Sequence, residues 1–225
     1  MQQAEKAGIP KKTYAGLGHM CRALLANIGG LDKWKRQTAV AKARSLQEVR
    51  DICARINFTY FLDYDDQIDT KQREFEAAIT HFNLSVEGKD VLDVGPGTAD
   101  SLDFAKAKGA KSTWFVEGEP VFVKFARLKG HQGRMRNYYY KPFFPKSMKG
   151  QFDLIYTKGS INCDWVNKQG AYIAAGDPRG FFDFAAWVVA LKDLLKGQGD
   201  IILVPAMGRQ ETRLIDDEYD LDTYY

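Results

Sequence analysis

A glycine-rich turn is the feature of this sequence with the clearest capacity for chemistry. Residues 88–100 read Gly-Lys-Asp-Val-Leu-Asp-Val-Gly-Pro-Gly-Thr-Ala-Asp, which is an apolar strand, a glycine turn and the start of a helix. Glycines let a ligand approach the backbone without meeting a Cβ, and the free N–H groups of a helix N-terminus point at that ligand. The pattern predicts a ligand-binding turn, a device that dinucleotide enzymes also use.

Two acidic residues at this turn discriminate between ligand classes. The dinucleotide fingerprint G-x-G-x-x-G requires glycine where this chain has Asp100, whose side chain would obstruct strand–helix packing and repel a pyrophosphate. Asp93, two residues before Gly95, suits a ligand with an amine and a sulfonium, because a carboxylate can hold both cationic groups. The sequence therefore favours a sulfonium ligand over NAD.

Residues 91–99 resemble the first motif of class I methyltransferases, which bind S-adenosylmethionine on a Rossmann-like fold. Ala99 stands where that family commonly has a third glycine. Trp-Phe-Val-Glu at 114–117 resembles the second motif, in which an acid at the end of the second strand binds the ribose hydroxyls. The resemblance implies that Glu117 is the ribose ligand, since a carboxylate accepts hydrogen bonds from two vicinal hydroxyls.

The similarity extends over about residues 70–205, with residues 151–156 resembling the start of the fourth strand and residues 194–203 the turn into the fifth. The third-strand acid that commonly touches the adenine amine is not evident, and Asn137 is our substitute.

No metal is expected, because the acids at 63–69 lack the ligand alternation and the glycine of a calcium loop. The residues expected to bind the cofactor are Asp93, Gly95, Pro96, Gly97, Glu117, Asn137 and Tyr156.

The acceptor of a methyl group should bind beyond the carboxyl ends of the strands, next to residues 156–165. This segment lacks the N/D-P-P-Y/F signature of enzymes that methylate amino groups of adenine or glutamine. Lys158 and Asp164 are the ionisable candidates for orienting or deprotonating an acceptor, although surface ion pairs use the same residue types.

Short apolar strands alternate with helices from about residue 90, which predicts an α/β fold with a mostly parallel sheet and helices on both faces. Strands are predicted at 91–94, 113–116, 152–156 and 200–204, and helices at 101–108, 120–129 and 181–196. Gly197 is expected to end the last of these helices, and Pro205 the last strand. We expect the cofactor-binding Rossmann-like domain to cover residues 70–225. The chain ends about twenty residues after the fifth strand, so either this domain is shortened or the recorded sequence is incomplete.

Residues 1–69 are expected to form an N-terminal helical extension or lid. Apolar spacing predicts helix over 13–60, with a capping box at Ser45 and Glu48. Residues 58–69 are predicted to be a solvated connector that ends in a helix cap at Asp69. The helix after it should bury Phe75 and Ile79.

Composition places the chain among ordinary globular proteins, with 45% hydrophobic and 27% charged residues. No stretch approaches the ~18 apolar residues of a membrane span, and the N-terminus lacks the apolar run of a signal peptide, so we expect a cytoplasmic protein without membrane partners. Residues 1–60 carry eleven Lys or Arg against four Asp or Glu, which can meet phosphates or form an ordinary solvated face.

Three functions are compatible with these features. The first is an S-adenosylmethionine-dependent methyltransferase acting on an oxygen or nitrogen of a small-molecule acceptor. The second is an RNA methyltransferase whose basic helices at 11–55 bind phosphates. The third is a methyltransferase-like binding subunit without catalysis. The first is our expectation, and the sequence determines neither the acceptor nor the oligomeric state.

Overall fold

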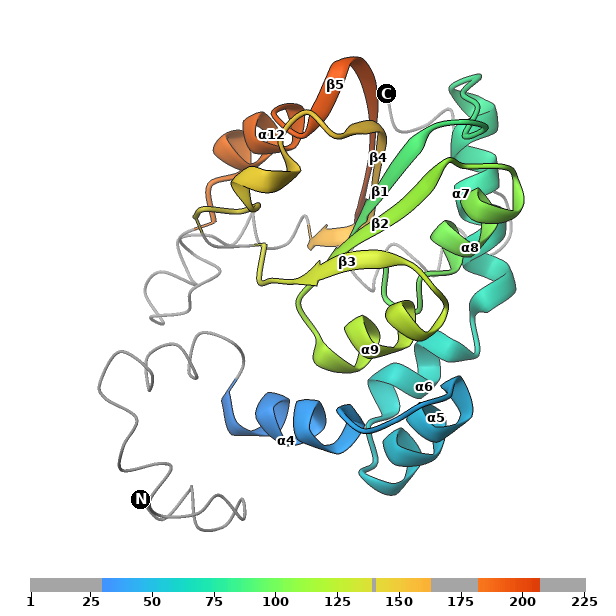
Figure 1. The fold of residues 1–225 in the computed structure, drawn as a ribbon, viewed down its shortest axis with the longest axis vertical. Coiled ribbons are helices and arrows are strands. Elements are labelled where there is room, and N and C mark those ends of the chain that lie inside the picture. The colour runs from blue at the N-terminus through green and yellow to red at the C-terminus, as the bar shows by residue number, and fades with distance from the viewer. Residues whose placement is uncertain (1–29, 139–140, 163–181, 207–225) are drawn as a thin grey trace.

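The part of the chain that the structure describes forms a parallel sheet of five strands. The computed structural model describes residues 30–138, 141–162 and 182–206. Its strands are β1 (Asp90–Val94), β2 (Ser112–Glu117), β3 (Gln132–Met135), β4 (Phe152–Asn162) and β5 (Leu195–Ala206), in the order β3-β2-β1-β4-β5 (Figure 1). The strand order reverses between β1 and β4, which makes this a doubly wound, Rossmann-like sheet.

Helices cover both faces of the sheet, as the sequence predicted. On one face, α7 (Ile68–His81), α8 (Asp100–Ala107) and α9 (Pro120–Leu128) share an apolar cluster with Val91 and Leu154, which are register partners on β1 and β4. On the other face, α12 (Phe184–Lys192) buries Trp187 against Leu92 and Ile155, the next pair in that register. Period-two alternation along each strand thus supplies one residue to each layer. None of the described helices combines the length and the apolar character needed to cross a membrane.

In the described residues, three further helices precede α7 and pack on the outer side of α9. They are α4 (Gly30–Val40), α5 (Leu46–Arg55) and α6 (Thr59–Asp65), seen at the bottom of Figure 1. A third apolar cluster joins them to α9, and it contains Val40, Ala43, Val49, Cys53, Phe61, Val121, Phe122 and Phe125. The predicted cap of α5 is confirmed, because the Glu48 backbone N–H donates to Ser45 Oγ at 3.1 Å. The predicted helical positions before residue 30 lie outside the described residues.

The prediction of a solvated connector over 58–69 is wrong, because this segment contains α6. Phe61 is fully buried, with its ring centroid 5.8 Å from that of Phe122 and 5.1 Å from that of Phe125. The acid-rich composition suggested that the segment is exposed to solvent. Its aromatic residues instead lie on one face of a helix, and that face packs against α9. The cap at Asp69 is also wrong, since α7 begins at Ile68 and has Gln67 at its N-cap without a side-chain hydrogen bond.

Helix α12 ends, and strand β5 begins, at earlier positions in the chain than the glycines suggested. The helix α12 ends at Lys192, and Gly197 lies inside β5 rather than at the end of the helix. The register between β4 and β5 shifts at this point, because Phe152 pairs with Leu195 whereas Leu154 pairs with Asp200. A shift of this kind absorbs the additional residues as an irregularity in the ladder. Strand β5 also continues past Pro205, which an edge strand tolerates because it needs fewer backbone donors.

The third apolar cluster predicts that α6 contributes to global stability. Phe61→Ala should lower the free energy of unfolding by about 3 to 5 kcal/mol, because a fully buried aromatic side chain is lost and a cavity remains. The neighbouring change Asp63→Ala, at an exposed position of the same helix, should alter stability by about 0.5 kcal/mol or less. Urea denaturation monitored by circular dichroism measures both values. Equal stability of the two variants would show that α6 does not belong to the core.

Candidate functional site

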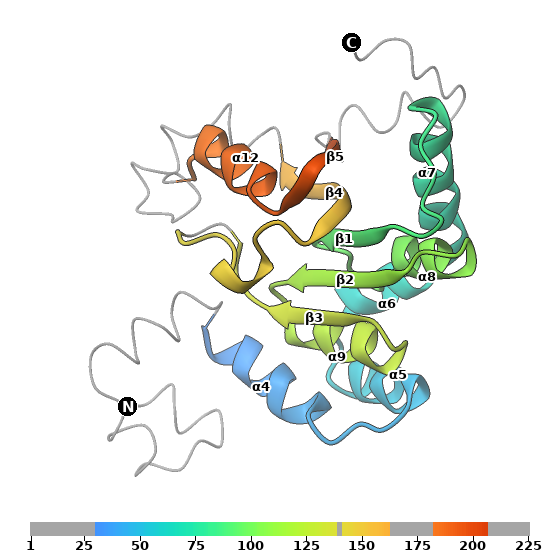
Figure 2. The same cartoon turned by 45° about the horizontal axis from the view of Figure 1, so that its top comes forward.

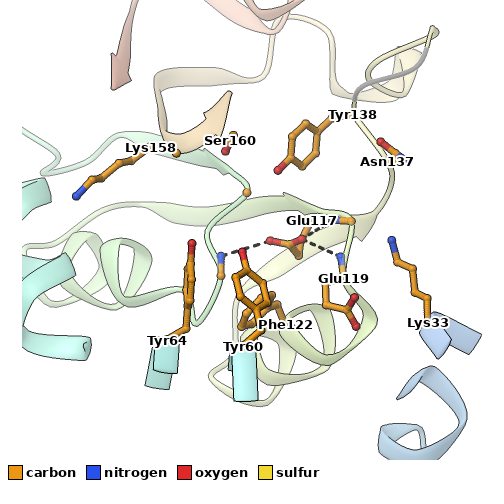
Figure 3. Close-up of a pocket in the computed structure, with 14 residues that line it drawn as sticks. Lys33, Tyr60, Tyr64, Glu117, Glu119, Phe122, Asn137, Tyr138, Lys158 and Ser160 are labelled. Atoms are coloured by element: carbon orange, nitrogen blue, oxygen red, sulfur yellow. Dashed lines mark hydrogen bonds between the residues drawn. The ribbon is translucent and has the colours of Figure 1, made fainter. Parts of the chain in front are cut away.

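A pocket of about 210 Å³ lies at the carboxyl ends of the strands, where the order of the sheet reverses (Figure 3). Its floor is formed by the turn after β1, the end of β2 and the end of β4, and one side by residues that follow β3. Side chains from α4, α6 and α9 form the opposite side. Ligands of open α/β sheets bind at this position, so the fold alone makes this pocket the candidate site.

The two glycines of the turn after β1 are required by the backbone and by their neighbours. Gly95 has φ +77° and Gly97 has φ +58°, both in the left-handed region that favours glycine. A Cβ on Gly95 would overlap Ser160 Oγ and would lie 2.6 Å from the Tyr138 hydroxyl. A Cβ on Gly97 would lie 2.7 Å from the Tyr64 ring. The absence of side chains at these positions therefore lets the walls of the pocket contact the turn directly.

Glu117, at the end of β2, faces this turn from the neighbouring strand (Figure 3). Its Oε2 accepts a hydrogen bond from the Gly97 N–H at 3.3 Å, and its Oε1 accepts from the N–H groups of Gly118 and Glu119 at 2.6 and 2.8 Å. Burial raises the pKa of the Glu117 carboxyl to about 7, although these three N–H donors favour the ionised form. The result is a pocket-lining carboxylate that titrates near neutral pH.

Asp93 is buried on β1, just before the glycine turn, and does not line the pocket. It is 2% exposed, and its Oδ2 accepts a hydrogen bond from the Ser101 hydroxyl of α8. Its Oδ1 has no hydrogen-bond partner among the described residues, which is unusual for a buried carboxylate oxygen. Burial raises the pKa of Asp93 to about 7, and the nearby charge of Glu117 adds to the increase. Two acidic groups with elevated pKa values thus flank the glycine turn.

Asp100 has a structural partner that the sequence did not indicate. It is fully buried in the first turn of α8, where its Oδ1 accepts from Lys129 Nζ at 2.7 Å and its Oδ2 from the Thr98 hydroxyl at 2.5 Å. Lys129 comes from the end of α9 and also pairs with Asp103. This carboxylate occupies the helix N-terminus that a dinucleotide enzyme would offer to a pyrophosphate.

Sequence reasoning did not assign the side chains of α4 and α6 that reach the pocket. Lys33 and Tyr60 line it, and so does Tyr64, whose ring has Lys71 Nζ 3.5 Å from its centroid. Burial lowers the pKa of Lys33 and also that of Lys71, the latter to about 8. The aromatic residues at 60 and 64 have the i, i+4 spacing of one helix face, which was a usable signal once the segment was recognised as helical.

Glu119 holds α4 against the pocket. Its carboxylate accepts two hydrogen bonds from the Arg36 guanidinium, at 2.9 and 2.8 Å. Such a bidentate pair fixes orientation as well as distance. The same guanidinium lies 4.6 Å from the centroid of the Phe58 ring, so α4 is held to both α9 and α6. This geometry explains why Lys33, one helical turn earlier, lies at the mouth of the pocket.

The structure brings together five of the residues predicted for the site: Gly95, Gly97, Glu117, Asn137 and Lys158. Lys158 forms an ion pair with Glu74 of α7 at the edge of the pocket. Tyr156 does not line the pocket, because its ring packs in the core with its centroid 4.6 Å from that of Phe75. Asp93 and Pro96 are buried beside the turn and do not line the pocket either, and Asp164 lies outside the described residues. Among the residues that the structure describes, no group of three or more potential metal ligands occurs.

No protein-family model matches the chain, and no curated protein matches it. Solved structures with a similar arrangement include a S-adenosylmethionine dependent methyltransferase from Mesorhizobium loti, with 18% identity and TM-score 0.42 over 56% of this chain and 49% of that one. A putative S-adenosylmethionine-dependent methyltransferase from Methanococcus maripaludis has 16% identity and TM-score 0.41, over 74% and 65% of the two chains.

A third similar structure is the complex of a Haloferax volcanii methyltransferase activator with a putative methyltransferase, at 16% identity and TM-score 0.44, over 64% of this chain and 55% of that one. The chain thus spans from about half to about two thirds of the length of these three proteins. The Rossmann-like arrangement of this chain follows from its own strand order.

Proposed function

We propose that the chain binds S-adenosylmethionine in this pocket and transfers its methyl group to an oxygen or nitrogen of an acceptor. The observation that carries the proposal is the juxtaposition of the buried Glu117 carboxylate with the backbone of the glycine turn at Gly97. A carboxylate in this position can accept hydrogen bonds from two ribose hydroxyls. The nearby Asp93, with an unpartnered oxygen, adds negative charge that favours a cationic sulfonium ligand.

The residues of the pocket fit the chemical groups of this cofactor. Glu117 provides acceptors for hydroxyls, Asn137 an amide for the adenine edge, and Tyr60 an exposed aromatic ring. Pockets that hold complete small-molecule ligands typically measure about 300 to 1,000 Å³. The cavity of about 210 Å³ is smaller than this, and Tyr64 is the side chain that narrows it over the turn. Binding the whole cofactor therefore requires α6 or its tyrosines to move outward, which agrees with a lid formed by the N-terminal helices.

When bound, the cofactor would supply an electrophilic methyl carbon with a thioether as the leaving group, and the acceptor would give up a proton in exchange for the methyl group. The contribution of the protein is to position the acceptor and to exclude water. Lys158 is our candidate for orienting the acceptor, because this residue of β4 lines the pocket; its ammonium group is paired with Glu74 of α7 and would have to turn toward the acceptor. We assign proton removal to Asp164 as a proposal.

A small molecule is our first candidate for the acceptor, and an RNA nucleotide is the second. The pocket is narrow and partly covered, which suits a compact acceptor. The second candidate is favoured by exposed cations on α9 and β3, two of the elements that surround the pocket. A protein that binds the cofactor and turns over no acceptor would be a methyltransferase-like binding subunit.

Loss of the Glu117 carboxylate should weaken cofactor binding. In Glu117→Ala, we expect the affinity for S-adenosylhomocysteine, measured by isothermal titration calorimetry, to fall at least tenfold from a micromolar value. Two hydrogen bonds to a charged acceptor are lost, and each is worth about 1.5 to 3 kcal/mol. The matched control is Glu76→Ala, which removes a half-exposed carboxylate of α7. Unchanged affinity in a folded Glu117→Ala protein would remove this residue from the site.

The raised pKa of Glu117 predicts a pH dependence of binding. Only the ionised carboxylate accepts from both hydroxyls, so affinity should rise with pH between about 5.5 and 7.5 and level off above the pKa of about 7. In Glu117→Gln, affinity should be weaker and the increase with pH smaller, because Asp93 remains as the second group titrating in this range. Calorimetry in buffers of matched ionic strength measures both curves. A wild-type affinity that stays constant from pH 5.5 to 7.5 would contradict a role for the ionised carboxylate.

A further inference from the structure

An acid-free stretch of the chain covers α9, β3 and the segment after β3. Residues 120–152 contain no Asp or Glu and eight Lys or Arg, namely Lys124, Arg127, Lys129, Arg134, Arg136, Lys141, Lys146 and Lys149. An imbalance of this size in a chain of net charge +3 concentrates positive potential on one part of the surface.

Three of these cations form ion pairs with carboxylates, and a fourth, Arg136, is held by the segment that follows β3. Lys129 is buried with Asp100 and Asp103, and the Arg136 guanidinium donates to the Phe143 carbonyl at 2.8 Å. Lys141 and Lys149 form ion pairs with carboxylates at the two ends of α12. These four residues stabilise the fold. The function of the other four cations is not accounted for by ion pairs among the described residues.

Four exposed or half-exposed cations form a continuous row, which we call the cationic stripe: Lys42, Lys124, Arg127 and Arg134. Lys124 Nζ donates to the Ala41 carbonyl at 3.3 Å, which places it beside Lys42. Arg127 donates to the Gly133 carbonyl at 3.4 Å, which places it beside Arg134. Lys124 and Arg127 are three residues apart on α9 and share a face of that helix. No member of the stripe is ion-paired with a carboxylate in the described ranges.

The stripe crosses the two elements that lead to the pocket. Strand β3 ends at Met135, and Asn137, two residues later, lines the pocket. Helix α4 has Lys33 in the pocket near its first residue and ends at Val40, two residues before Lys42. Both elements pack against α9, as Figures 1 and 2 show. The stripe therefore approaches the pocket at its Arg134 end, whereas Lys42 and Arg127 lie at the ends of α4 and α9 that point away from the pocket, so a bound strand would have to extend from the stripe to reach it.

Charge on an edge strand has a second explanation, because cations there prevent pairing with other chains. That explanation accounts for Arg134 on β3, which is at the edge of the sheet. It does not account for Lys124 and Arg127, which are on a helix, or for Lys42. The mouth of the pocket also carries Tyr60, an aromatic side chain that is 51% exposed. Proteins recognise single-stranded nucleic acids with two components. Cations lie along the phosphate backbone, and exposed aromatic rings stack on the bases.

We infer that the cationic stripe binds the phosphate backbone of a single-stranded nucleic acid and directs an unpaired base to the pocket. A single strand is required because a base within a duplex cannot enter a narrow pocket. The role of the stripe in binding stands on its own, whereas the role of the base as methyl acceptor rests on the proposed function.

The test measures binding of a fluorescein-labelled, unstructured 20-nucleotide RNA by fluorescence anisotropy. The stripe variant is Arg127→Glu with Arg134→Glu, and the control is Lys108→Glu with Lys192→Glu, which makes the same change in net charge at exposed positions directly after α8 and at the end of α12. At about 50 mM salt, the stripe variant should bind at least tenfold more weakly than wild type, and the control within threefold. The slope of log affinity against log salt should become shallower by about 1.4, since each lost phosphate contact removes about 0.7.

The outcomes separate this inference from the proposed function. Equal losses in the two double variants, or no RNA binding by the wild type at 50 mM salt, would overturn it. Stripe-dependent binding to vesicles of anionic phospholipid in the absence of RNA binding would overturn it as well. Each variant is also titrated with S-adenosylhomocysteine, for which wild-type affinity is expected and shows that the fold is intact. If RNA binding depends on the stripe but the wild type binds no S-adenosylhomocysteine, the stripe stands and the proposed function fails.

Discussion

The burial of an acidic side chain between two adjacent parallel strands is the constraint on which the candidate site depends. Glu117 ends β2 with its carboxylate directed at the backbone of the turn after β1, and it accepts hydrogen bonds from Gly97, Gly118 and Glu119. Position 97 has a left-handed backbone that favours glycine, and a Cβ there would meet the Tyr64 ring on the opposite side of the turn from Glu117. Desolvation raises the pKa of the Glu117 carboxyl to about 7, so the same contact that shapes the pocket also prepares a group that titrates at physiological pH.

The helices before β1 complete the site from the other side. The sequence of these helices predicts only part of their arrangement, because the side chains that fix their position do so through contacts with α9. Phe61 attaches α6 to the apolar cluster, and the bidentate pair of Arg36 with Glu119 attaches α4. Two adjacent residues of the same segment thus have different roles, since Phe61 is in the core while Tyr60 is half exposed at the pocket. Stability and ligand access are therefore coupled in α6.

The sequence was sufficient for four of the five described strands and for the glycine turn, because each depends on local pattern. Strand β3 was not among the predicted strands, since its residues are polar or exposed and show no apolar run. The position of Glu117 at the end of β2 was predicted from the resemblance to the second motif of class I methyltransferases. The sequence was insufficient where tertiary contacts decide. The acids between residues 58 and 69 concealed α6, and the core position of Tyr156 depends on its packing against Phe75. The partner of Asp100, Lys129, is 29 residues away, and no local pattern connects them.

The identity of the ligand is the central claim, and a parallel calorimetric titration of the wild-type protein at pH 7.5 tests it most directly. The two titrants are S-adenosylhomocysteine and NAD, which share an adenosine but differ in the group that meets the glycine turn. With Asp93 behind the turn and Asp100 paired in the first turn of α8, the site should bind S-adenosylhomocysteine with micromolar affinity and give no heat with NAD. Saturable binding of NAD without binding of S-adenosylhomocysteine would contradict the account.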